Sequence, residues 1–96
     1  MQVSEVKEKV NPILREYGVK RAAIFGSIAR GDSTNASDVD ILIDLGESNM
    51  GMIKHMEFIE KMENKLGRKV DLVTENSGAK FLKPHIISDL KIIYEG

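Results

Sequence analysis

The sequence has no cysteine and few aromatic residues. Without cysteine, the chain can form neither a disulfide framework nor a zinc site with thiolate ligands. Its two tyrosines and three phenylalanines offer no stacking platform of the kind that single-strand nucleic-acid binders use. Folding must therefore depend on an ordinary hydrophobic core, and two classes of site are excluded.

Long hydrophobic runs and a large excess of one charge are also missing. The apolar runs are only a few residues long, so we expect no membrane-spanning segment, and no secretory signal pattern opens the chain. These absences predict a cytoplasmic protein. The formal net charge of −1 argues against a dedicated nucleic-acid binder, which would carry a basic patch.

Composition and length predict a single domain over residues 1–96. Hydrophobic residues make up 42% of the chain and charged residues 30%, which is an ordinary balance for a globular protein. We find no internal repeat, low-complexity run or interdomain linker. One hydrophobic core is what a chain of this size can build.

Three segments have the sequence signals of helices. The first covers 3–17 and ends before Gly18, and Pro12 predicts a kink or a break within it. The second covers 52–66 and carries a methionine stripe, which we assign to the core, with contact to a partner as the alternative. A third, short helix is expected to begin at Pro84.

Four apolar segments have the length and pattern of strands, namely 21–25, 38–45, 69–74 and "KIIY" near the end, which we expect at a sheet edge. The helix over 52–66 is long enough to be a crossover that makes its two flanking strands parallel. The first two strands have a shorter connection, so we expect them to be antiparallel. The fold class is therefore α/β or α+β, a small mixed β-sheet with helices packed mainly on one face.

Three aspartates interrupt these strands. Asp38 and Asp40 point the same way from one strand, with Cα atoms roughly 7 Å apart. At an effective dielectric constant near 20, two unit charges at that distance repel by about 2 kcal/mol. A divalent cation removes the conflict, and Mg²⁺ prefers carboxylate and phosphate oxygens. Asp71 lies in another apolar strand and can join the pair if the strands are neighbours.

The alternative for each aspartate is an ordinary position on a solvent-exposed sheet face. Asp44 serves as a comparison, because strand alternation places it on the same face as Asp38 and Asp40 but at the far end of the strand. We expect Asp44 to be a solvated strand-end charge.

The stretch "FGSIARG" follows the first strand and should form a single helical turn over 27–30, closed by Gly31. Backbone amides around Gly26 and Ser27 would make an anion site there, and Arg30 is a candidate clamp for a polyphosphate. The alternative is a glycine turn with a serine N-cap and an exposed arginine. A phosphate site beside a metal site indicates a nucleoside triphosphate bound with magnesium.

These motifs resemble the nucleotidyltransferase superfamily that shares the polymerase-β palm. The resemblance rests on Gly26-Ser27, ten intervening residues, Asp38-Val39-Asp40 and a later Asp71. The small size is similar to the minimal nucleotidyltransferase (MNT) family, whose members are typically encoded beside a helical HEPN protein. The resemblance implies a nucleotidyltransferase (polymerase-β palm-like) fold.

The resemblance also implies a set of site residues, taken residue by residue: catalytic and metal-binding Asp38, Asp40 and Asp71, and nucleotide-binding Gly26, Ser27, Arg30 and Ser37. The three aspartates would bind two Mg²⁺ ions, with Mn²⁺ as a substitute, and ATP would be the substrate. Asp71 would also help to deprotonate the attacking hydroxyl.

The implied reaction transfers AMP from ATP to a hydroxyl acceptor. A domain this small has little surface left to enclose a small acceptor, and its charge and sparse aromatics disfavour a nucleic-acid end. The resemblance points to a tyrosine of a HEPN toxin, which makes this chain the antitoxin of a type VII pair. Two alternatives stay open: a non-catalytic nucleotide-binding module that neutralises a partner by binding, and a small-molecule nucleotidyltransferase of the antibiotic-modifying kind. A homo-oligomer is also left open.

Overall fold

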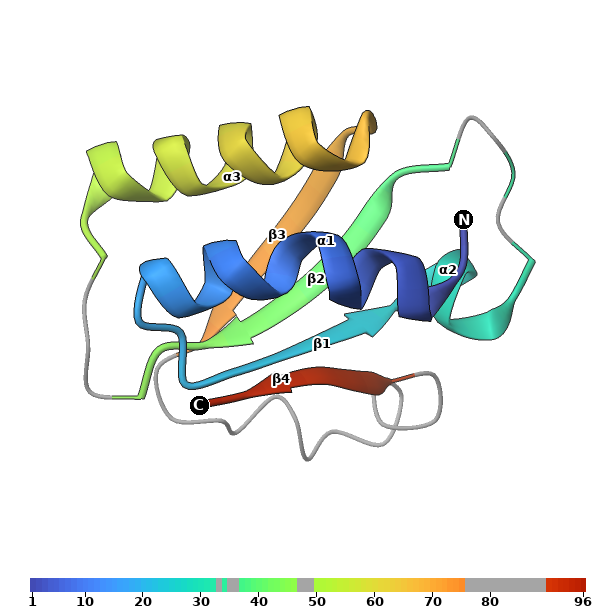
Figure 1. The fold of residues 1–96 in the computed structure, drawn as a ribbon, viewed down its shortest axis with the longest axis horizontal. Helices are drawn as coiled ribbons and strands as arrows, with labels where there is room; N and C mark the ends of the chain where they lie inside the picture. Colours follow the sequence, from blue (N-terminus) through green and yellow to red (C-terminus); the bar gives the residue numbers. More distant parts are fainter. Residues whose placement is uncertain (33, 35–36, 47–49, 76–89) are drawn as a thin grey trace.

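The computed structural model describes residues 1–32, 34, 37–46, 50–75 and 90–96. Within these residues the order of elements is α1 (Val3–Glu16), β1 (Arg21–Phe25), α2 (Gly26–Arg30), β2 (Val39–Asp44), α3 (Met52–Leu66), β3 (Val70–Glu75) and β4 (Lys91–Glu95) (Figure 1). The short helix expected from Pro84 lies outside the described residues. None of the helices just named is long and apolar enough to cross a membrane.

The four strands form one mixed sheet in the order β3-β2-β1-β4. β1 is antiparallel to both β2 and β4, whereas β2 is parallel to β3, to which α3 connects it. The expected crossover, the antiparallel first pair and the edge position of "KIIY" are therefore confirmed. The register of β2 places Asp40 opposite Phe25 on one side and opposite Asp71 on the other.

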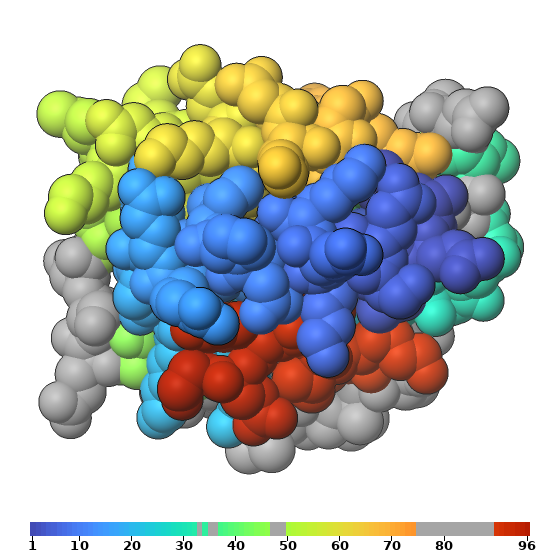
Figure 2. All heavy atoms as spheres, in the orientation of Figure 1, coloured from blue at the N-terminus to red at the C-terminus, as the bar shows by residue number. Residues whose placement is uncertain are grey.

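α1 and α3 cover one face of the sheet and lie side by side over it (Figures 1 and 2). Their buried side chains meet the inward residues of the strands in the main core; the helices contribute Val6, Val10, Leu14, Phe58, Met62 and Leu66. Tyr17, which directly follows α1, packs its ring against that of Phe58 in α3 in a tilted arrangement, with the ring centroids 5.2 Å apart. On the opposite face, Ala23 and Leu42 form a smaller buried cluster. The expected fold class, a mixed sheet with helices mainly on one face, is confirmed.

The break expected near Asn11 is wrong, because α1 continues through Pro12 as far as Glu16. Pro12 lies on the exposed side of the helix, where water can replace the one hydrogen bond that proline cannot donate. The Asn11 side-chain amide donates to the carbonyl oxygen of Lys7 at 2.9 Å and to that of Ile93 at 3.1 Å. The bond to Ile93 ties this turn of α1 to the edge strand β4, and the bond to Lys7 stays within the helix.

The methionine stripe of α3 is only partly in the core. Met62 is fully buried, whereas Met52 is 80% exposed and Met56 is 65% exposed. The assignment to the core was therefore right for Met62 and wrong for Met52 and Met56. Figure 1 shows the reason, since the first turn of α3 extends beyond the ends of α1 and of the sheet. Ile53 in the same turn is 76% exposed.

Asp44 is not the solvated strand-end charge that we expected, because it is only 2% exposed. Its Oδ1 atom accepts a hydrogen bond of 2.8 Å from the backbone N–H of Gly46. The chain turns immediately after β2, with Gly46 at a φ of 62°. An aspartate that bonds the backbone two residues further on stabilises such a turn, and this bond holds the carboxylate inside the fold.

Candidate active site

The turn after β1 and the carboxylate of β2 are in direct contact. β1 ends at Phe25 and α2 begins at Gly26, whose φ of 76° favours glycine. A Cβ atom added to Gly26 would overlap the Asp40 carboxylate. Glycine at position 26 is therefore required twice, once for the backbone conformation and once for the close approach of Asp40.

The structure brings Asp71 and Asp38 near Asp40, although the three carboxylates do not converge into one compact cluster. Asp71 is the register partner of Asp40 across the parallel pair of β2 and β3, and Asp38 lies directly before β2. Partial burial raises the pKa of the Asp40 carboxyl, and the negative charges of Asp71 and Asp38 raise it further, against an opposing effect of the Arg30 guanidinium. The like-charge conflict inferred from the strand pattern is therefore present in the fold.

These carboxylates fit a divalent cation that is held jointly with substrate phosphates. Their oxygens are the hard donors that Mg²⁺ prefers, and a cation would relieve the repulsion around Asp40. Across the residues that the structure describes, no three acidic or histidine side chains converge closely enough to form a complete cation site. Both the repulsion around Asp40 and the incomplete set of protein ligands agree with a cation whose remaining ligands are phosphate oxygens of the nucleotide.

The first turn of α2 presents Gly26 and Ser27 next to the carboxylates. Its N-cap is Phe25, and no side chain caps its amides, so Ser27 does not act as the N-cap that the alternative interpretation proposed. The turn closes at Gly31, with a φ of 83°, as expected. The carbonyl oxygen of Ser27 accepts the N–H of Asp32 at 3.0 Å, which folds the following chain back onto α2.

Arg30 and Ser37 lie near the site but have protein partners of their own. The Arg30 guanidinium is 3.3 Å from the carboxylate of Asp32, in an ion pair that is largely exposed. The Ser37 hydroxyl accepts the backbone N–H of Thr34 at 2.8 Å. Ser37 therefore shapes the turn before Asp38, and Arg30 would have to exchange its contact with Asp32 in order to hold a phosphate.

Two residues near the carboxylates were missed by the sequence analysis. Arg68 donates from Nη1 to the carbonyl oxygen of Thr34 at 2.8 Å, and Glu63 accepts the backbone N–H of Val70 at 2.9 Å. Neither belongs to a motif or a hydrophobic stripe. The only signal was their position shortly before the strand that contains Asp71.

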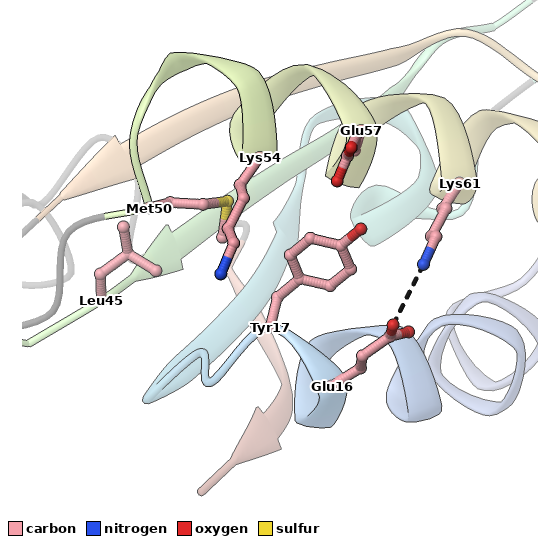
Figure 3. Close-up of a pocket in the computed structure, with 7 residues that line it drawn as sticks. All are labelled: Glu16, Tyr17, Leu45, Met50, Lys54, Glu57 and Lys61. Carbon is pink, nitrogen blue, oxygen red and sulfur yellow. Dashed lines mark hydrogen bonds and ion pairs between the residues drawn. The ribbon is translucent and has the colours of Figure 1, made fainter.

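A pocket of about 290 Å³ opens between the end of α1 and the start of α3 (Figure 3). Its lining comprises Glu16, Tyr17, Leu45, Met50, Lys54, Glu57 and Lys61. Glu16 accepts a hydrogen bond of 3.1 Å from Lys61 and raises the pKa of that lysine, with Tyr17 as the next cause. Leu45 directly follows β2, so the pocket lies at the opposite end of this strand from Asp40 and is separate from the carboxylates.

Known proteins are similar to this chain in sequence. The family described as "Polymerase beta, Nucleotidyltransferase" matches residues 8–96. "Putative protein adenylyltransferase MJ0435" of Methanocaldococcus jannaschii is 40% identical over 89 residues, which cover 93% of this chain and 95% of that protein. "Protein adenylyltransferase MntA" of Thermococcus cleftensis is 45% identical over 65 residues, which cover 67% of this chain and 65% of that protein.

A solved structure also shares the fold. It is described as "tri-AMPylated Shewanella oneidensis HEPN toxin in complex with MNT antitoxin", and one of its chains superposes with a TM-score of 0.70 at 21% identity, over 97% of this chain and 72% of that chain. At this identity the likeness shows the fold alone. The match of the family and the identity to MJ0435 confirm the expected family and, with it, the enzyme class. The chain belongs to the polymerase β nucleotidyltransferase family.

Proposed function

We propose that this protein transfers AMP from ATP to a tyrosine hydroxyl of a HEPN toxin and acts as the antitoxin of that toxin. The observation that carries the proposal is the Asp40 carboxylate, held against Gly26 and beside Asp71 at the start of two parallel strands. Support for a protein acceptor comes from the 40% identity to a protein named as a protein adenylyltransferase. The related fold in a complex of an AMPylated HEPN toxin with its MNT antitoxin supports the choice of partner.

In this proposal the first turn of α2 binds the triphosphate. The backbone amides of Gly26 and Ser27 and the Ser27 hydroxyl contact the β- and γ-phosphates, because no side chain occupies these amides as a cap. Asp38, Asp40 and Asp71 hold two Mg²⁺ ions together with the phosphates. Such ions, when bound, stabilise charge on the attacking and leaving oxygens.

Asp71 takes the role of the proton acceptor. The tyrosine oxygen attacks the α-phosphorus, its proton passes to the Asp71 carboxylate, and the bond from the α-phosphorus to the pyrophosphate oxygen breaks. Products are the AMP–tyrosine ester and pyrophosphate. The Asp71 side chain is exposed, so a tyrosine on a macromolecule can approach it without entering a closed cavity.

The test is to incubate the purified chain with ATP, Mg²⁺ and the HEPN protein encoded beside it, and to measure the intact mass of the partner. We expect the partner to gain one or more AMP residues on tyrosine, and the gain to disappear with Asp40→Asn. Asp44→Asn is the matched control, because Asp44 lies on the same strand and its turn contact can be kept by asparagine. An unmodified partner, with AMP found instead on tRNA or an aminoglycoside, would overturn the proposal that a HEPN tyrosine is the acceptor.

A second candidate function is neutralisation by binding alone. It is favoured by the exposed apolar side chains of Met52, Ile53 and Met56 at the start of α3, which form a surface suited to a protein contact. The double variant Asp38→Asn/Asp40→Asn separates the two functions in cells that express the toxin. Protection equal to that of the wild type would support binding alone, whereas loss of protection with retained complex formation supports AMP transfer.

A further inference from the structure

The turn between α3 and β3 reaches both strands that bear the carboxylates. α3 ends at Leu66, and Gly67 follows in the left-handed conformation with a φ of 69°. This reversal leaves Arg68 next to the segment that precedes β2. The backbone continues the contact, because the N–H of Val39 donates to the carbonyl oxygen of Lys69 at 2.9 Å.

Arg68 contacts two residues that precede Asp38 in the chain, Thr34 and Ser37. One guanidinium nitrogen, Nη1, donates to the carbonyl oxygen of Thr34 at 2.8 Å and to that of Ser37 at 3.4 Å. Thr34 and Ser37 are themselves joined, since the N–H of Ser37 donates to the carbonyl oxygen of Thr34 at 3.1 Å. Arg68 therefore contacts two residues that are hydrogen-bonded to each other, and one of them, Ser37, is the direct neighbour of Asp38.

Glu63 makes the equivalent contact on the other strand. Its Oε2 atom accepts the N–H of Val70 at 2.9 Å, and Val70 is the direct neighbour of Asp71. β3 is an edge strand whose neighbour in the sheet is β2. The Glu63 carboxylate therefore gives the Val70 N–H, at the start of this edge strand, a hydrogen-bond acceptor. Glu63 in the last turns of α3 and Arg68, two residues beyond its end, thus each contact the residue before a carboxylate.

Asp38 needs such a restraint more than its neighbours do. It lies outside the ladder of β2, it is exposed, and it interacts unfavourably with Asp40. Two like charges repel each other. A residue outside a strand can move away from such a neighbour at little cost in free energy. The hydrogen bonds of Arg68 oppose that movement. They restrain the backbone before Asp38 and leave its carboxylate available to a ligand.

We propose that Arg68 is a positioning residue of this active site, which holds the backbone of Thr34 and Ser37 in place so that Asp38 stays beside Asp40 to receive the metal–nucleotide complex. Its effect on catalysis rests on the proposed function. Arg68 acts through the backbone and makes no contact with the reacting atoms.

The test compares Arg68→Ala, Arg68→Lys and the control Arg15→Ala, which removes an exposed arginine of α1. Amide hydrogen exchange is measured at residues 37–39 of the free protein. Calorimetry with Mn²⁺ and a non-hydrolysable ATP analogue gives the affinity, and AMP transfer gives kcat and the Mg²⁺ concentration for half-maximal rate. For Arg68→Ala we expect faster exchange at 37–39, weaker binding, a higher half-maximal Mg²⁺ concentration and a kcat lower by on the order of ten- to a hundredfold.

Arg68→Lys should recover part of each effect, because an ammonium group can still donate to one carbonyl, and Arg15→Ala should match the wild type. Unchanged exchange at 37–39, or a fall in kcat and thermal midpoint with no change in metal–nucleotide affinity, would overturn the proposal. If the wild type binds Mn²⁺ and the analogue but modifies no toxin, only the assignment of a toxin tyrosine as the AMP acceptor is overturned. In that case exchange and affinity still decide the role of Arg68.

Discussion

Asp40 and Asp44 lie on the same face of the same strand, yet their surroundings differ in kind. Asp44 is 2% exposed, and its carboxylate accepts the N–H of Gly46 in a local turn. Asp40 lies against the backbone of Gly26, and partial burial, followed by the charges of Asp71 and Asp38, raises the pKa of its carboxyl. One carboxylate stabilises the fold through a local bond, whereas the other is kept in an unfavourable electrostatic environment that a cation would relieve. Strain of the second kind is typical of functional sites.

The strongest way to test this contrast is to neutralise each carboxylate. For Asp40→Asn we expect AMP transfer to fall by on the order of a thousandfold, equivalent to about 4 kcal/mol of transition-state stabilisation, because the variant removes a proposed metal ligand. Asp44→Asn should transfer AMP at the wild-type rate per folded molecule. Initial rates of AMP incorporation check both variants. Equal losses in the two variants would show that the strand as a whole, and not Asp40, matters for the reaction.

The Gly26 contact can be tested with alanine. Gly26→Ala should cost about 1–3 kcal/mol of folding free energy from backbone strain, with the overlap between the new Cβ and the Asp40 carboxylate added to it. Gly18→Ala is the matched control, because Gly18 has a φ of 70° but open space around its Cβ position. Urea denaturation should show a clearly larger loss for Gly26→Ala. Similar losses for both would mean that only the positive φ matters.

The turn at the other end of β2 predicts a smaller loss of stability. Asp44→Ala removes the acceptor for the N–H of Gly46 and should cost about 1–2 kcal/mol of the free energy of unfolding. Asp44→Asn keeps an acceptor oxygen and should cost less. The urea midpoints of the two variants check the difference, and a midpoint for Asp44→Ala at or above that of Asp44→Asn would contradict it.

The smallest effect concerns pH. The folded state raises the pKa of Asp40 above its ordinary value of 3.8, so the folded state binds the proton more tightly than the unfolded state does. This contribution to stability is fully present below pH 3.8 and is lost as the pH rises through the raised pKa. Relative to Asp40→Asn, the wild type should therefore lose stability across that window in metal-free buffer. Denaturation curves for the two proteins that stay parallel over this window would contradict the prediction.

Most of the fold could be predicted because its signals are local. Hydrophobic periodicity located α1, α3 and the strands, and Gly31 and Gly67 ended their helices as expected. The candidate site was found for the same reason, because a carboxylate within an apolar strand is visible in any short window of sequence. The roles assigned to these carboxylates, and to Arg30 and Ser37, stay predictions.

Contacts between distant residues could not be predicted in this way. The exposure of Met52 and Met56 depends on where α1, beside α3, and the sheet, beneath it, come to an end. The contact of Arg68 with Thr34 joins residues 34 positions apart, and no spacing rule marks either partner.

The sequence by itself determined the alternation of strands and helices, the family and the placement of three aspartates in or beside apolar strands, since each depends on residue type and short spacing. Only the tertiary structure decided which aspartate of β2 is a satisfied turn residue and which is held among like charges. The alternation of a strand gives Asp40 and Asp44 the same face. The difference between them arises from what the rest of the chain places against each end of that face: the turn at Gly46 at one end, and Gly26 with Asp71 at the other.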